Sequence, residues 1–197
     1  MGSWLGLGGA ACLVLAILGG LIVAVGGWFV LTYNGLVQLR NAVKNAWSQI
    51  DVQLKRRYDL IPNLVETVKG YAGHERQTLE AVVEARQQAI SFTGSIEDRA
   101  KVENVLTQTL RALFAVAEAY PDLKANQNFL ALQEELATTE NKIGFARQYY
   151  NDMAKQYKNR TEVFPSNIVA GMFNFKAEPF FQLESSQERV APQVKFQ

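Results

Sequence analysis

The first 39 residues of this chain carry no charged side chain, and Arg40 is the first charge. From residue 4 to residue 33 every side chain is apolar, small or uncharged, whereas a membrane-spanning helix needs only about 20 such residues. Trp4 and Trp28 lie roughly 36 Å apart along a helix, so an aromatic ring would sit near each face of a hydrocarbon core of ~30 Å. The sequence therefore predicts one transmembrane helix over residues 4–33, preceded by a short tail, residues 1–3.

A cleaved signal peptide is the alternative, but it would need a basic N-terminal region and an apolar run of about 7–15 residues. The chain has neither, so we expect a retained single-pass anchor. Basic residues follow the span at Arg40 and Lys44 and are missing before it. The positive-inside rule then places the rest of the chain in the cytoplasm and the N-terminus outside.

Small residues recur at four-residue spacing inside the predicted span. They are Cys12, Ala16, Gly20 and Ala24. Such a ridge lets two helices approach closely and would support self-association in the membrane. The alternative is that glycine and alanine are simply common in membrane helices.

Composition and motifs exclude several classes of function. With 20 basic and 19 acidic residues, the chain lacks the clustered basic excess of a nucleic-acid-binding protein. Cys12 is the one cysteine and His74 the one histidine, so neither an intrachain disulfide nor a multi-histidine metal site can form. The chain contains neither a phosphate-binding loop motif nor a nucleophile-elbow motif. We expect no catalytic residues, no cofactor and no metal site.

The soluble part has the periodicity of long helices. The stripe of the first helix steps by three or four, through Leu36, Leu39, Val43, Trp47, Ile50, Leu54, Tyr58, Ile61, Val65 and Val68. Pro62 should either kink this helix or start a new one, and residues 70–73 should end it. A second helix is expected from about His74 to Ser91, and a third should begin at a capping box formed by Ser95 and Asp98.

The fourth helix shows a coiled-coil-like seam of alternating three- and four-residue steps. Its members are Phe129, Leu132, Leu136, Thr139, Ile143, Ala146, Tyr150, Met153 and Tyr157. We expect an all-α chain in which residues 34–163 form an antiparallel bundle of about four long helices after the span. Residues 164–197 should be an irregular, aromatic-rich tail. Its phenylalanines, at 173, 175, 180, 181 and 196, should pack on the bundle or on a neighbouring subunit.

Polar residues cluster on the first helix and recur on the fourth. They are Asp51, Lys55, Arg56, Arg57, Asp59, Asn63 and Asn141. Four interpretations stay open: a solvated face with ion pairs such as Lys55 to Asp51 or Asp59, a network that fixes the register of the helices, a face that binds a partner, or a catalytic site.

Several segments resemble the LemA family of bacterial proteins. They are LRNAVKNAWSQIDVQLKRRYDLIPNLV at residues 39–65, AEAYPDLKAN at 117–126, TENKI at 139–143, RQYYN at 147–151 and FPSN at 164–167. The resemblance implies a single N-terminal span in a bacterial inner membrane and a helical domain. It implies no catalytic residues.

Together these observations favour a membrane-anchored, non-enzymatic scaffold or interaction protein that self-assembles. The expected partners are the lipid bilayer, further copies of the chain and other membrane proteins. One alternative is an adaptor or modulator of another membrane complex, such as one for envelope stress or proteolysis. A ligand-binding bundle or an enzyme is the other.

Overall fold

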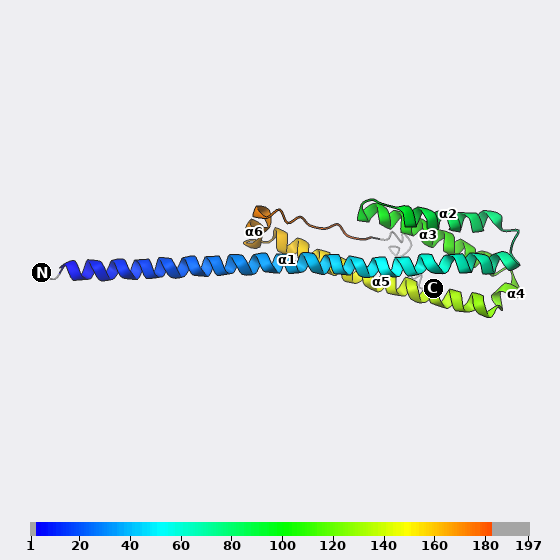
Figure 1. Ribbon diagram of the computed structural model, residues 1–197, viewed down its shortest axis with the longest axis horizontal. Coiled ribbons are helices and arrows are strands. Elements are labelled where there is room, and N and C mark those ends of the chain that lie inside the picture. Colours follow the sequence, from blue (N-terminus) through cyan, green and yellow to red (C-terminus); the bar gives the residue numbers. More distant parts are fainter. Residues whose placement is uncertain (1–2, 183–197) are drawn as a thin grey trace, which may run out of the picture. The chain divides into compact units, whose positions relative to one another are not determined.

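The computed structural model describes residues 3–182, with their side chains from residue 12 onward. This part of the chain is all-α, and no strand occurs in it. The helices are α1 (Ser3–Tyr71), α2 (Arg76–Ser91), α3 (Ile96–Ala117), α4 (Pro121–Lys124), α5 (Gln127–Glu162) and α6 (Ser166–Met172) (Figure 1).

The chain divides into two compact units. Of the described residues, those up to Val43 and Lys155–Glu178 belong to the N-terminal unit, and Lys44–Ala154 and those from Pro179 onward belong to the second unit. Because α1 and α5 each begin in one unit and end in the other, both units are built on these two helices.

The N-terminal part of α1 is long and apolar enough to cross a membrane, and its side chains from Cys12 to Trp28 are exposed. Trp4, the other expected interfacial tryptophan, lies outside the residues whose side chains are described. The helix does not break at the Asn34-Gly35 pair. The predicted span and the predicted first helix of the soluble part are therefore one helix.

Helix α1 also runs on through Pro62, so the expectation that a new helix begins there is wrong. A proline lacks the N–H that would bond the carbonyl four residues earlier, here that of Tyr58. The Nε–H of Arg86 on α2 donates to this carbonyl at 2.7 Å. An arginine from a neighbouring helix thus satisfies the acceptor that the proline leaves free, and the helix ends at Tyr71 as the glycines at 70 and 73 predict.

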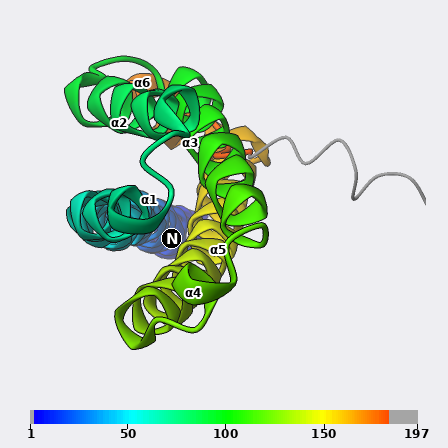
Figure 2. The ribbon, with the colours of Figure 1, turned by 90° about the vertical axis from the view of Figure 1, so that its right-hand side faces the viewer.

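Helices α2 and α3 lie side by side in the second unit (Figures 1 and 2). The predicted helix start at Ser95 is confirmed, because the Ser95 hydroxyl caps α3 by accepting a hydrogen bond from the backbone N–H of Asp98 at 3.1 Å. Helix α2 begins two residues later than expected and buries Leu79, Val82, Ala85 and Ala89. Pro121 occupies the first turn of the short α4.

Helix α5 contains the predicted seam. Seven of its positions are buried, namely Phe129, Leu136, Thr139, Ile143, Ala146, Tyr150 and Tyr157, while Leu132 and Met153 are half-buried. Six of these seven side chains are apolar or aromatic, and packing of such a stripe is the main source of stability for a long helix like this 36-residue one.

The expectation of an irregular C-terminal tail is wrong for residues 166–172, which form α6. Asn174 ends this helix in the left-handed region, with φ of 55°. The N–H of Phe175 donates to the carbonyl of Ala170 and that of Asn174 to the carbonyl of Gly171, at 2.9 and 3.3 Å. These two bonds form a Schellman motif, which directs Phe175 back onto α1, where its ring centroid lies 5.7 Å from that of Tyr33.

Candidate functional site

The centre of the second unit contains ionised side chains that are shielded from solvent. We call Arg57, Tyr58, Glu103, Thr107 and Glu140 the buried charge network. Arg57 and Glu103 are each 1% exposed. One guanidinium nitrogen of Arg57 donates to Glu103, and the other donates to Glu140 at 2.8 Å and to Thr107 at 3.1 Å. The Tyr58 hydroxyl donates to the second carboxylate oxygen of Glu103.

The network joins three helices. Arg57 and Tyr58 belong to α1, Glu103 and Thr107 to α3, and Glu140 to α5. The planar guanidinium can bond several acceptors in one plane at once, which lysine cannot do. A shift of any of these helices along its axis would separate the donors from the acceptors. The network therefore specifies the register of α1 against α3 and α5.

Sequence reasoning singled out Arg57 but missed its partners on α3 and α5. The helical periodicity of the sequence does contain a signal for Glu103 and Glu140. Glu103 lies three residues before the buried Leu106, and Glu140 lies three residues before the buried Ile143, so both fall in the register of an apolar face. A charge on such a face needs an opposite charge within reach. The sequence alone does not say which basic residue provides it.

Burial, followed by the nearby charge of Glu103 and the hydrogen bond to it, raises the pKa of the Tyr58 hydroxyl well above its usual value. The hydroxyl therefore stays protonated and acts as a donor over the physiological pH range. A phenol in this state is a poor base. The arrangement of Tyr58, Glu103 and Arg57 is that of a closed, charge-balanced structural cluster.

The other predicted polar residues lie outside this network. Lys55 pairs with Asp59 at 3.2 Å on the surface, Arg56 pairs with Glu135 on α5, and Asp51 lies 3.4 Å from Arg99 on α3. Asn63 and Asn141 are exposed. The structure thus brings only Arg57 of the predicted set into the interior and leaves the remaining six on the surface.

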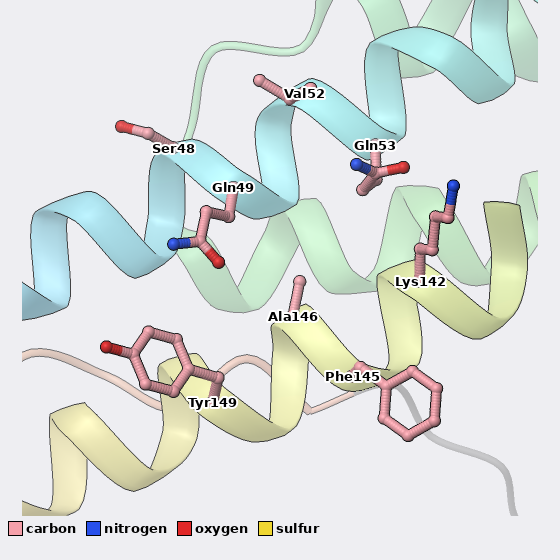
Figure 3. Close-up of a pocket in the computed structure, with 8 residues that line it drawn as sticks. All are labelled: Ser48, Gln49, Val52, Gln53, Lys142, Phe145, Ala146 and Tyr149. Atoms are coloured by element: carbon pink, nitrogen blue, oxygen red, sulfur yellow. The ribbon is translucent and has the colours of Figure 1, made fainter.

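A solvent-open pocket of about 560 Å³ lies between α1 and α5 in the second unit (Figure 3). Its lining residues are Ser48, Gln49, Val52, Gln53, Lys142, Phe145, Ala146 and Tyr149. The side chain of Phe145 is 73% exposed, and Val52 and Tyr149 are exposed as well. We call Val52, Phe145 and Tyr149 the α1–α5 patch. Sequence reasoning did not identify it, because none of its members breaks the helical pattern.

The small-residue ridge of α1 is exposed along its whole length. Cys12, Ala16, Gly20 and Ala24 lie on a part of the helix that no other described segment covers, and a Cβ atom added at Gly20 would meet no atom within 4 Å. Among the described residues no group of three or more histidine, cysteine, aspartate or glutamate side chains is placed to hold a metal ion.

Comparison with known proteins identifies the chain's relatives. The LemA family model matches residues 46–196, which include the buried charge network and the α1–α5 patch. Protein LemA of Metamycoplasma hominis is 27% identical, over 80% of this chain and 71% of that protein. A magnetosome protein MamQ of Paramagnetospirillum magneticum is 22% identical, over 87% and 72% of the two chains.

A magnetosome protein MamQ of Magnetospirillum gryphiswaldense is 20% identical, over 94% of this chain and 78% of that protein. Each of these alignments covers more than two thirds of both chains. The family model alone covers well over half of the 197 residues. The chain belongs to the LemA family.

Proposed function

We propose that this chain is a membrane-anchored, non-enzymatic scaffold that self-assembles at the inner membrane of a bacterium. The observation that carries the proposal is the α1–α5 patch. Phe145, which is 73% exposed, and the exposed Val52 and Tyr149 line one pocket between two helices. Exposed apolar side chains gathered around one pocket are a feature of contact sites between proteins.

The anchor in this proposal is the apolar part of α1, with the N-terminus outside and the second unit in the cytoplasm. Arg40 and Lys44, the first basic residues after the span, support this sidedness. The relatives named as magnetosome proteins are consistent with a role at membranes. The small-residue ridge, beginning at Cys12, would supply a second contact between copies, within the bilayer.

The second unit is proposed to be an antiparallel bundle whose role is to display the patch. Three contacts support side-by-side packing of its helices. They join Arg57 to Glu103, Arg56 to Glu135, and Arg86 to the Tyr58 carbonyl. The buried charge network would hold α1 and α5 in one register. A fixed register keeps Val52 of α1 and Phe145 and Tyr149 of α5 around the same pocket.

Photo-crosslinking in native membranes tests the proposal. A benzophenone amino acid placed at Phe145 should yield a covalent product of twice the chain mass. The same group at Glu134, an exposed position of α5 outside the pocket, should yield none. A single product with a different protein would favour the adaptor reading, and no product at Phe145 would contradict a contact through this patch.

A further inference from the structure

The turn after α5, together with α6 and the residues that follow it, exposes a second apolar surface in the N-terminal unit. We call residues 163–175 the hairpin. Phe164 is 75% exposed and Met172 67% exposed, and Val163, Ile168 and Phe173 are exposed too. Ile168 and Met172 lie four residues apart on α6, so they share one side of this helix, and Phe164 is exposed in the turn just before it. The opposite side, with Val169 and Ala170, is buried.

This hairpin contacts α1 at the end of the apolar span. The ring centroid of Phe173 lies 5.9 Å from that of Phe29 and 4.7 Å from that of Tyr33, and Thr32 is buried. Figure 1 shows α6 beside the blue part of α1. Tyr33 follows Trp28 by roughly 7.5 Å along the helix, which is about the depth of one lipid headgroup region.

The hairpin also lacks charge. Residues 163–175 contain no charged side chain, and the run is flanked by Glu162 and Lys176. The part of α1 that it contacts belongs to the uncharged first 39 residues. No ionised group would therefore lose water if this surface entered the headgroup region, and its exposed apolar side chains would gain a partly apolar environment.

We infer that α6 and the residues just before it are a second membrane contact, an interfacial helix that dips Phe164, Ile168 and Met172 into the leaflet on the side of Tyr33. The inference rests on the proposed anchor, because the apolar surface of the hairpin is continuous with the exposed apolar surface of α1. A helix of seven residues cannot span a bilayer but can lie in its interface.

Fluorescence quenching in proteoliposomes tests the inference with the full chain. Cys12→Ser removes the only cysteine, and single cysteines are then introduced by Ile168→Cys, Met172→Cys, Leu21→Cys or, as a reference on α2, Val83→Cys, and labelled with the fluorophore NBD. Spin-labelled lipids carry the quencher either near the headgroup or deep in the chain. All four positions are exposed, so the substitutions leave the interior unchanged.

The label at Ile168 or Met172 should be quenched by the shallow spin label at least twofold more than the label at Val83. The label at Leu21 should be quenched most by the deep one. Quenching at Leu21 without quenching at either hairpin position would overturn the interfacial helix and leave the anchor intact. A blue-shifted but unquenched label on the hairpin would mean that protein covers it, which also overturns the inference. Lack of quenching at Leu21 would overturn the anchor itself.

Discussion

The positively charged side chain of Arg57 is almost fully buried in the interior of the second unit. Removing a guanidinium and a carboxylate from water is costly, and their attraction offsets the cost only when the remaining donors and acceptors are also satisfied. Thr107, Tyr58 and Glu140 provide most of those bonds, while the Nε of Arg57 lacks a partner. The network is therefore better explained by the register it specifies than by net stability.

Glu103→Ala should destabilise the second unit by about 3–5 kcal/mol, because it leaves the Arg57 charge buried without its main partner. Glu140→Ala should cost much less, since the Glu140 side chain is 43% exposed and solvent screens its pair with Arg57. Urea unfolding of the full chain in detergent, followed by helical circular dichroism, measures both changes.

The paired replacement Arg57→Met with Glu103→Leu removes both charges and is the control for this experiment. It should recover most of the lost stability, because apolar side chains of similar volume avoid the desolvation cost. A cost below about 1 kcal/mol for Glu103→Ala, or a double variant as unstable as the single one, would show that the pair is not buried in solution.

The raised pKa of Tyr58 predicts a loss of stability at alkaline pH. Because the folded-state pKa lies above the unfolded value of about 10, the contribution of Tyr58 is complete below pH 10 and is lost as the pH rises toward the folded pKa. Tyr58→Phe should make the decline of the unfolding free energy above pH 10 shallower by up to about 1.4 kcal/mol per pH unit, which is the slope for one proton.

Unfolding free energies at half-unit steps from pH 9 to pH 11.5 measure this slope for wild type and Tyr58→Phe. Tyr120 and Tyr157 also have raised pKa values, through a hydrogen bond to Glu75 and through burial respectively, so a residual slope is expected in the variant. Identical slopes for the two proteins would contradict the assignment to Tyr58.

At the scale of elements, the continuity of α1 depends on a hydrogen bond that replaces the one lost at Pro62. The proline leaves the Tyr58 carbonyl without its helical donor, and Arg86 of α2 supplies one. Arg86→Met should cost about 1–3 kcal/mol for a carbonyl left unsatisfied. In the Pro62→Ala background the cost should fall by about 1 kcal/mol, because the N–H restored at position 62 can bond the same carbonyl.

A double-mutant cycle of these two changes, measured by urea unfolding, isolates the coupling between the proline and the arginine. Strictly additive costs would mean that Arg86 stabilises α1 by some route other than the Tyr58 carbonyl.

Helix packing in the membrane gives a further test at this scale. Gly20→Leu should reduce self-association through the ridge several-fold, because a bulky side chain at its centre prevents close approach of two helices. Gly26→Leu adds the same bulk about 200° around the helix from Ala24 and should have little effect. Energy transfer between labelled copies in liposomes reports the change, and equal transfer in both variants would exclude the ridge as a contact.

Local signals were enough to predict most elements from the sequence. The helical stripe of the first helix, the glycines that end it, the Ser95 cap and the seam of α5 each depend on residues within a turn or two of one another. Helix α6 was missed because its seven residues are too few to show a period and its phenylalanines suggested an irregular chain.

The candidate sites were harder to predict, because they join residues that are far apart in the chain. Arg57 and Glu103 are separated by 46 residues, and nothing near Arg57 in sequence shows that α3 turns a carboxylate toward it. The α1–α5 patch likewise depends on which faces of two helices remain uncovered. Periodicity predicts which side of a helix is apolar but not how its neighbour is positioned.

At the scale of the whole molecule, the chain combines an exposed apolar helix that is long enough to cross a membrane with the exposed side chains of the α1–α5 patch on its second unit. Both surfaces lack a partner among the described residues. A single chain dispersed in water or in lipid would leave the patch solvated. Self-assembly would cover Val52, Phe145 and Tyr149 in each copy.

The mass of the full chain in mild detergent tests this claim most directly. Size-exclusion chromatography with light scattering should give a discrete particle of several copies of the 22.0 kDa chain, after subtraction of the bound detergent. Phe145→Ser with Tyr149→Ser should shift that particle toward smaller assemblies while the helical content is unchanged, because both residues are exposed. A monomer for the wild-type chain, or an assembly that the double substitution leaves intact, would contradict self-assembly through the α1–α5 patch.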